Sequence, residues 1–185
     1  EVDLDQEALL STDPFAHQRP YFAPNTAAGY NDAFAQVLDD VLQDSHAFGG
    51  GDPNIVALSV SWGLCEADTD PQDIQTLEPI LTSLLAAGVT VFASTGDAGI
   101  YDGCSSGSPD VDYPASSPEV VGVGGTTLNP IGNSAPNNGT NWAEIGWGCS
   151  SSGDCATNGG SGGGASSTFD NPTFQSVIAD SPFST

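Results

Sequence analysis

Asp97 is the carboxylate in this sequence whose surroundings most suggest chemistry. The stretch 88–99, GVTVFASTGDAG, begins with a glycine typical of a helix end and continues as a short apolar, β-branched segment. A turn of small residues follows, so Asp97 is predicted at the carboxyl end of a buried strand, where ligands bind in open α/β sheets. A solvated Asp in an ordinary turn is the alternative, and the local sequence leaves both interpretations open.

Glu1 and Asp5 are a second set of carboxylates, with the spacing of neighbours on a helix. The segment 1–10, EVDLDQEALL, is predicted to be helical, which places both carboxylates on one face, one turn apart. Two like charges at this spacing destabilise a helix modestly. The pair is therefore either simply solvated, which the spacing alone favours, or arranged to share a proton.

The sequence lacks the residues that other common catalytic and metal sites require. Neither His17 nor His46 lies in a strand-tip or elbow motif, which disfavours a serine hydrolase assisted by histidine. The motif HExxH is absent, and the acidic stretch 68–73 lacks the glycine and distal Glu of an EF-hand loop, so a solvated surface is expected there. The carboxylates that remain as candidates are Glu1, Asp5 and Asp97.

The elements that would position these carboxylates alternate between strand and helix. A short strand is expected at 19–24, and a helix capped by Asn31 or Asp32 is expected to end at the glycines 49–51. An apolar strand at 55–61 follows. Next comes a helix whose apolar positions lie between 74 and 85, where Pro79 starts or kinks the helix and Gly88 closes it.

Strand, helix and strand with short connections predict a parallel βαβ unit built from residues 55–94. Its two strand tips, 61–63 and 94–97, would then lie side by side as two walls of a cleft. Further along, a short strand is expected at 120–125, and turns with short hairpins around Trp142 and Trp147. The run GGSGGG at 159–164 is not a dinucleotide fingerprint, because no suitable strand precedes it and no helix clearly follows it.

Length and charge narrow the class of protein. The 185 residues suffice for one domain, or most of one, and the 24 acidic residues against a single Lys or Arg give a formal net charge of -23. Nucleic acid and anionic membrane surfaces are disfavoured as partners, since both need clustered basic residues, and no apolar run is long enough to span a membrane. Self-repulsion would fall at low pH, which fits a protein that works in acid, although the charge could equally serve solubility.

The four cysteines predict disulfides rather than a metal site. They form no CxxC pair and have no neighbouring histidine, which makes zinc binding unfavourable. Three pairings are open to four cysteines. The preferred pairing joins Cys149 to Cys155 across a short loop and Cys65 to Cys104 across the loops after two successive strands.

Several motifs together resemble the sedolisin family of serine-carboxyl peptidases, which act in acid and have a subtilisin-like fold. They occur in family order: the ExxxD pattern of EVDLD, SVSWG at 59–63, the STGDAG turn, YPASSPEVVGVGGTTL at 113–128 and, more loosely, GGGASSTFDNPTFQ. The resemblance implies an α/β fold, a parallel sheet flanked by helices. CEAD at 65–68 resembles members in which that cysteine pairs with one after the GDxG turn, and this supports the Cys65–Cys104 pair.

The resemblance also implies catalytic roles. Glu1 would take the proton of a nucleophilic serine, Asp5 would hydrogen-bond to Glu1 and tune it, and protonated Asp97 would donate to the oxyanion. Backbone around SVSWG would pair with an extended substrate, and the STG turn would border the pocket for the residue before the cut. The implied substrate-binding residues are Ser59, Ser61, Trp62, Gly63, Ser94 and Gly96.

The chain departs from the family pattern at its carboxyl end. The SGTS-type segment with the nucleophile is missing, so residues 1–185 are expected to be the N-terminal portion of one catalytic domain, poorly soluble or molten by itself. Calcium is implied by the family, at a site in the missing part, and no metal ligand is expected here. The expected partners are a peptide or protein substrate and a second polypeptide that carries the serine.

The setting implied is secretion, or another acidic compartment. Two alternatives remain from the sequence. One is a catalytically inactive relative that binds peptides in the same cleft, and the other is an acidic, disulfide-tied domain with a structural role.

Overall fold

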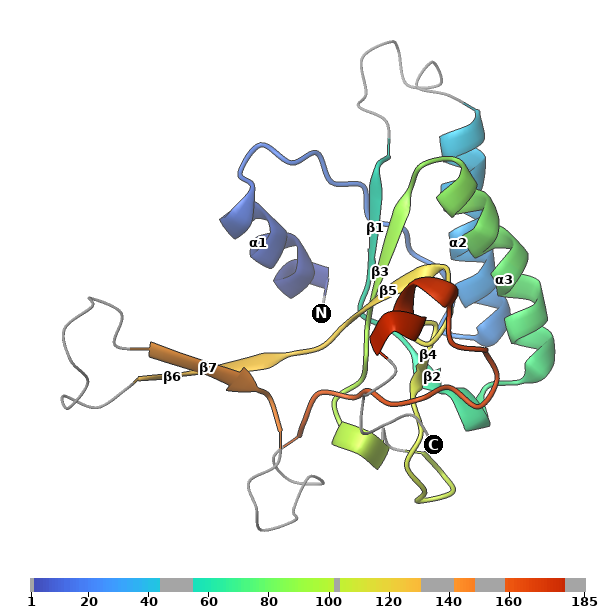
Figure 1. Cartoon of the computed structure of the whole chain (residues 1–185). Helices are drawn as coiled ribbons and strands as arrows, with labels where there is room; N and C mark the ends of the chain where they lie inside the picture. Colours follow the sequence, from blue (N-terminus) through green and yellow to red (C-terminus); the bar gives the residue numbers. More distant parts are fainter. Residues whose placement is uncertain (1, 44–54, 102–103, 131–141, 149–158, 179–185) are drawn as a thin grey trace. The chain divides into compact units, whose positions relative to one another are not determined.

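The computed structural model of this chain describes residues 2–43, 55–101, 104–130, 142–148 and 159–178 (Figure 1). Its contacts divide the chain into two compact units. The first unit contains residues 1–61 and 70–91, and the second contains 62–69 and 92–185. Each unit is described with its own residues.

The first unit is built on helices that pack through apolar faces. It contains α1 (Val2–Thr12), α2 (Ala27–Leu42), β1 (Ala57–Val60), α3 (Pro71–Ala86) and the start of β3 (Thr90–Ser94). Helices α2 and α3 lie side by side (Figure 1). Their apolar residues recur every three or four positions, which places them on one face of each helix and removes that face from water. The buried members are Phe34, Val37, Ile74, Leu77, Leu81 and Leu84.

The predicted βαβ unit is confirmed as β1, α3 and β3, with β1 and β3 adjacent in a parallel sheet of order β1-β3-β5. Asp70 caps α3 by accepting a hydrogen bond from the amide of Gln72 at 2.8 Å, and a proline occupies the first turn, where no amide is needed. Pro79 lies inside α3, which continues through it to Ala86. Gly88, with φ of 87°, turns the chain toward β3 as predicted.

Two predictions for the first unit were wrong. Residues 19–24 form no strand, because the two prolines in that segment lack the amide that a ladder requires. Helix α2 begins before Asn31: Thr26 is its N-cap and accepts a hydrogen bond from the amide of Gly29 at 3.0 Å. The helix ends at Leu42, short of the glycines 49–51, which lie outside the described residues.

The second unit consists of short strands and single helical turns joined by loops. Its elements are β2 (Leu64–Cys65), η1 (Glu66–Asp68), η2 (Gly99–Tyr101), β4 (Asp112–Tyr113), β5 (Val120–Val123), β6 (Thr126–Pro130), β7 (Trp142–Gly146) and η3 (Thr173–Ile178). Strands β2 and β4 pair antiparallel, as do β6 and β7, which confirms the predicted hairpin around Trp142. Strand β5 confirms the strand expected at 120–125, two residues shorter.

In the described residues, every helix is too short or too polar to cross a lipid bilayer.

Candidate functional site

Asp5 and Ser61 bring together two of the motifs that the sequence singled out. Asp5 lies in the first turn of α1, and Ser61 directly follows β1. The Ser61 hydroxyl donates a hydrogen bond to Asp5 Oδ1 at 3.0 Å, across a separation of 56 residues. This bond orients the Asp5 carboxylate relative to the SVSWG segment. Glu1, the predicted partner of Asp5, lies outside the described residues.

Ser59 lies within β1 and is exposed, whereas Ser61 is half-buried. The next two residues of the motif belong to the second unit. Trp62 is 57% exposed, and Gly63 lies so close to β4 that a Cβ added to it would be 2.6 Å from Asp112 Oδ2. Because such a contact is far inside van der Waals distance, a side chain at position 63 would displace the buried Asp112.

Asp97 occupies an exposed turn after the end of β3, as the sequence predicts. Ser94 is the last residue of the strand and is half-buried, and Gly96 has φ of 87°, a conformation that glycine adopts without strain. Among the predicted catalytic carboxylates, Asp5 therefore lies in the first unit and Asp97 in the second.

The backbone on both sides of Asp97 is held by the glycine-rich segment 159–164. The amide of Gly160 donates to Asp97 O at 2.7 Å, and the amide of Gly99 donates to Gly160 O at 2.9 Å. The amide of Gly162 donates to Gly96 O at 3.2 Å. The first two bonds form a parallel bridge between Ala98 and Gly160, and all three fix the turn without using the Asp97 side chain.

Ser161 extends this contact to the link between β5 and β6. Its hydroxyl accepts a hydrogen bond from the amide of Gly125 at 3.0 Å and lies 3.3 Å from Thr95 Oγ1. Its own amide donates to Trp147 O at 2.9 Å. The turn that carries Asp97 is thus held from a segment more than sixty residues further along the chain.

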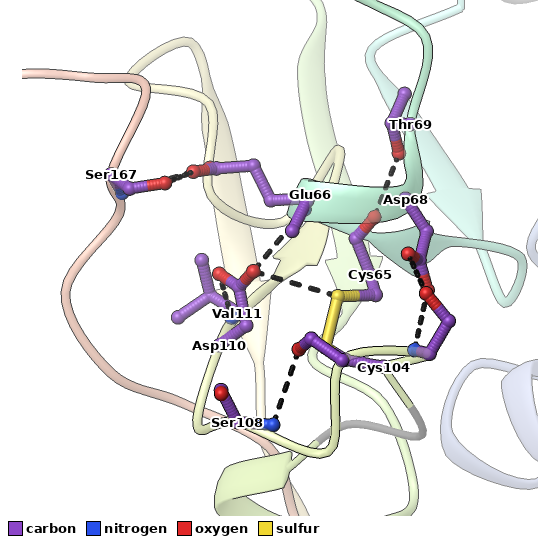
Figure 2. Close-up of a disulfide and its surroundings, with 12 residues drawn as sticks. Cys65, Glu66, Asp68, Thr69, Cys104, Ser108, Asp110, Val111 and Ser167 are labelled. Carbon is purple, nitrogen blue, oxygen red and sulfur yellow. Dashed lines mark hydrogen bonds between the residues drawn. A yellow bond between two sulfur atoms is a disulfide. The ribbon is translucent and has the colours of Figure 1, made fainter.

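The second unit also contains a disulfide and a buried carboxylate (Figure 2). Cys65 and Cys104 are joined, which confirms the predicted pair, with an S–S distance of 2.06 Å. Glu66 follows Cys65 directly and is only 3% exposed. The predicted Cys149–Cys155 pair lies outside the described residues.

The Glu66 carboxylate is surrounded by hydrogen-bond donors from residues 166–168. Ser166 Oγ donates at 2.7 Å to Oε2, the amides of Ser167 and Thr168 donate at 3.0 Å to Oε1, and Ser167 Oγ lies 3.2 Å from Oε1. Burial by itself raises the pKa of Glu66. The neighbouring hydroxyl groups of Ser116 and Ser166 and the backbone of Ser167 outweigh burial and hold the pKa below its ordinary value.

The acidic stretch 68–73 lies on the surface, as expected from the sequence. Asp68 is exposed and accepts hydrogen bonds from the amide and hydroxyl of Ser105, which lower its pKa, while Asp70 serves as the cap of α3. In the part of the chain that the structure describes, one group of potential metal ligands converges, formed by Cys65, Cys104 and Asp110. Both sulfurs belong to the disulfide, so this group does not suit calcium, which takes oxygen ligands.

Sequence analysis missed Glu66 and its donors. The segment CEAD was used only for its cysteine, and a Glu ordinarily predicts an exposed side chain. The one available signal was the run Ser166-Ser167-Thr168, a concentration of short donors after the glycines.

The chain resembles two curated proteins over nearly its whole length. It is 36% identical over 175 residues to kumamolisin from Bacillus sp. (strain MN-32), covering 95% of this chain and 28% of that protein. It is 34% identical over 190 residues to sedolisin from Pseudomonas sp. (strain 101), covering 98% of this chain and 30% of that protein. The chain thus spans less than a third of the length of these relatives.

Among solved structures, the fold matches Pseudomonas sedolisin, a serine-carboxyl proteinase complexed with two molecules of pseudo-iodotyrostatin. The TM-score is 0.65 at 31% sequence identity, over 88% of this chain and 42% of that chain. No protein-family model matches the chain.

Proposed function

The chain belongs to the sedolisin family, and from this membership we propose that the protein is an acid-acting serine-carboxyl peptidase that cleaves peptide bonds through an acyl-enzyme. The observation that carries the proposal is the hydrogen bond from Ser61 to Asp5. It joins the ExxxD and SVSWG motifs, which lie far apart in the sequence and which the catalytic assignment requires to act together.

In the proposed mechanism, Glu1 is the general base. It takes the proton of a serine hydroxyl as the serine oxygen attacks the carbonyl carbon, and it returns that proton to the amine that leaves when the C–N bond breaks. Water then attacks the acyl-enzyme by the same route. Asp5 would hydrogen-bond to Glu1 and orient it, so that proton transfer would occur within a pair of carboxyl groups. The hydrogen bond from Ser61 to Asp5 supports this role, since it fixes the Asp5 carboxylate.

Asp97 has a different task, because it donates rather than accepts a proton. In its protonated form its carboxyl group hydrogen-bonds to the oxygen that becomes negative in the tetrahedral intermediate. A carboxyl group can do this only below its pKa, which restricts activity to acid. The backbone bonds from Gly160 and Gly162 support this role, since they fix the turn while the Asp97 side chain remains exposed.

Substrate would bind as an extended strand along the SVSWG segment. Backbone from Ser59 to Gly63 would pair with it, and Ser94 and Gly96 would border the pocket for the residue before the cleaved bond. Trp62, more than half exposed, would provide apolar contact for a substrate side chain.

The remaining parts of the enzyme are proposed from the family. The nucleophilic serine lies on a segment outside these 185 residues, either later in the same protein or on a second polypeptide. Calcium is implied by the family, and we place its site in that part too. Secretion, or residence in another acidic compartment, fits the formal net charge of -23.

The proposal is tested by peptidase assays at acid pH on the full-length protein and its variants. Because one oxyanion donor typically contributes about 100- to 1,000-fold to kcat, Asp97→Ala should reduce kcat by roughly that factor. Asp5→Ala should also reduce kcat, whereas Asp3→Ala, an exposed carboxylate in the same helical turn, should not.

Full activity of Glu1→Ala or Asp97→Ala would exclude this mechanism. If the wild-type protein binds peptides in acid without cleaving them, the alternative is correct and the protein is a peptide-binding relative.

A further inference from the structure

Glu66 is a buried charge that the proposed catalytic steps do not use. It is 3% exposed, and the whole sequence offers only one Lys or Arg to balance it. That residue, Arg19, lies in the first unit and pairs with Asp40 at 3.3 Å. A carboxylate buried without a cation is costly unless hydrogen-bond donors replace its hydration, and Glu66 has such donors from one short segment, 166–168.

The donors of Glu66 also organise the segment that contains them. Ser166 Oγ donates to Glu66 and accepts from the amides of Thr168 and Phe169, at 3.0 and 2.8 Å. The segment therefore turns around the carboxylate, so that consecutive backbone amides point at one anion. If Glu66 were not a carboxylate, the amides of Ser167 and Thr168 would lose the charged oxygen to which they donate.

The other end of this segment holds the turn of Asp97. Residues 160–162 form the three backbone hydrogen bonds with the turn 96–99, and only 163–165 separate them from the Glu66 donors. Two of the intervening residues, Gly163 and Gly164, have φ of 150° and 158°. Glycines have the least conformational restraint of any residue, so this segment keeps its path only if both of its ends are attached.

The disulfide links the Asp97 turn to Glu66 by a second route. From the Asp97 turn the chain enters η2, and Cys104 follows, linked covalently to Cys65. Glu66 follows Cys65 directly and accepts hydrogen bonds from residues 166–168, whose segment also bonds to the turn 96–99. The Glu66 amide itself donates to Val111 O at 2.8 Å, which sets the position from which its carboxylate acts.

We propose that Glu66 is a positioning residue for Asp97, which acts by anchoring the 166–168 end of the glycine-rich segment that holds the Asp97 turn. The inference rests on the proposed function for its catalytic meaning. Its structural content, that Glu66 controls the order of residues 96–99, stands independently of activity.

Hydrogen exchange on the full-length protein tests the structural content. In Glu66→Gln, an amide group replaces an oxygen that accepts hydrogen bonds, so the amides of Gly99, Gly160 and Gly162 should exchange roughly 10-fold faster. The amides that pair β6 with β7 belong to the same unit and should change less than about two-fold. Asp170→Asn, which removes an exposed charge two residues after the donor segment 166–168, is the matched control. It should change the exchange rates of neither the three glycine amides nor the β6 and β7 amides.

Kinetics test the catalytic meaning. Because Asp97 is proposed to act on the transition state, Glu66→Gln should lower kcat by about 10-fold and leave KM within about two-fold, while Asp170→Asn leaves both unchanged. If Glu66→Gln does not fold, Ser167→Ala removes one donor hydroxyl and keeps the amide, and it should affect the same three glycine amides to a smaller extent.

The inference is wrong if exchange of the three glycine amides is unchanged in every folded Glu66 and Ser167 variant, or if β6 and β7 respond equally. It is also wrong if KM rises while kcat is retained. A wild-type protein without peptidase activity would refute the proposed function alone, and exchange would then decide the role of Glu66.

Discussion

The two units of this chain are held together by different physical means. In the first unit, the buried side chains of α2, α3 and the start of β3 are apolar apart from Asn31, and Leu81 and Leu84 are both 0% exposed. In the second unit, the buried set includes Glu66, Asp112 and Ser117, together with a disulfide and close approaches between glycines and neighbouring backbone. The first unit is stabilised mainly by removing apolar surface from water, and the second by satisfied polar groups and a covalent link.

The two units differ in how they are stabilised because the second unit contains the exposed turn with Asp97 and the first is built on packed helices. Packed helices tolerate change at exposed positions, because their apolar faces hold them in place. A turn that must expose a carboxyl group cannot bury its own side chains, so its backbone has to be fixed by hydrogen bonds from elsewhere. The proposed oxyanion donor, Asp97, therefore lies in the unit with less apolar support and more dependence on individual polar contacts.

The largest expected effect is in the apolar unit. Leu81→Ala removes a fully buried side chain and should lower the free energy of unfolding by about 4 kcal/mol, measured by urea denaturation. Leu85→Ala, at a position 49% exposed on the same helix, should cost less than about 1 kcal/mol. Equal effects of the two variants would show that the packing of α2 against α3 does not stabilise this unit.

A smaller effect is expected from the disulfide, and it should be confined to the second unit. Replacing both Cys65 and Cys104 with Ser opens a loop closed across 39 residues and should cost about 3 kcal/mol. Hydrogen exchange should accelerate in η1 and η2 while the amides of α2 and α3 keep their protection. Equal acceleration in the two helices would contradict the division of the chain into units with separate means of support.

The smallest expected effect depends on pH. The pKa of Glu66 is lowered in the folded protein, so its contribution to stability is complete above the ordinary value of 4.5 and is lost as pH falls through the lower folded value. Glu66→Gln should therefore cost about 2 kcal/mol at pH 7, and the difference from wild type should narrow below pH 4.5.

Thermal or urea unfolding between pH 3 and pH 7 measures this difference, with Asp170→Asn as the control. A difference that widens as pH falls would mean that the folded protein favours the protonated carboxyl group. The claim that hydrogen bonds from residues 166–168 stabilise the ionised Glu66 carboxylate would then be wrong.

Local pattern was sufficient for much of the fold. The helical spacing of apolar residues predicted α3, and the glycine at its end and the β-branched run after it predicted β3 and the turn with Asp97. These features depend on neighbours within a few residues, and the physical preferences that create them act over the same distance. The predicted start of α2 was wrong because Asn31 and Thr26 can both serve as N-cap residues. Only the folded helix shows which of the two side chains accepts a hydrogen bond from a free backbone amide.

The sequence by itself determined the βαβ unit, the acidic character and the family motifs, and it favoured the Cys65–Cys104 pair among three. Only the tertiary structure decided that Ser61 bonds to Asp5 and that Glu66 is buried, since the donors to Glu66 lie about 100 residues away. The physical reason is that a charged side chain is buried only where enough donors converge on it. Convergence is a property of the folded backbone, which no local pattern contains.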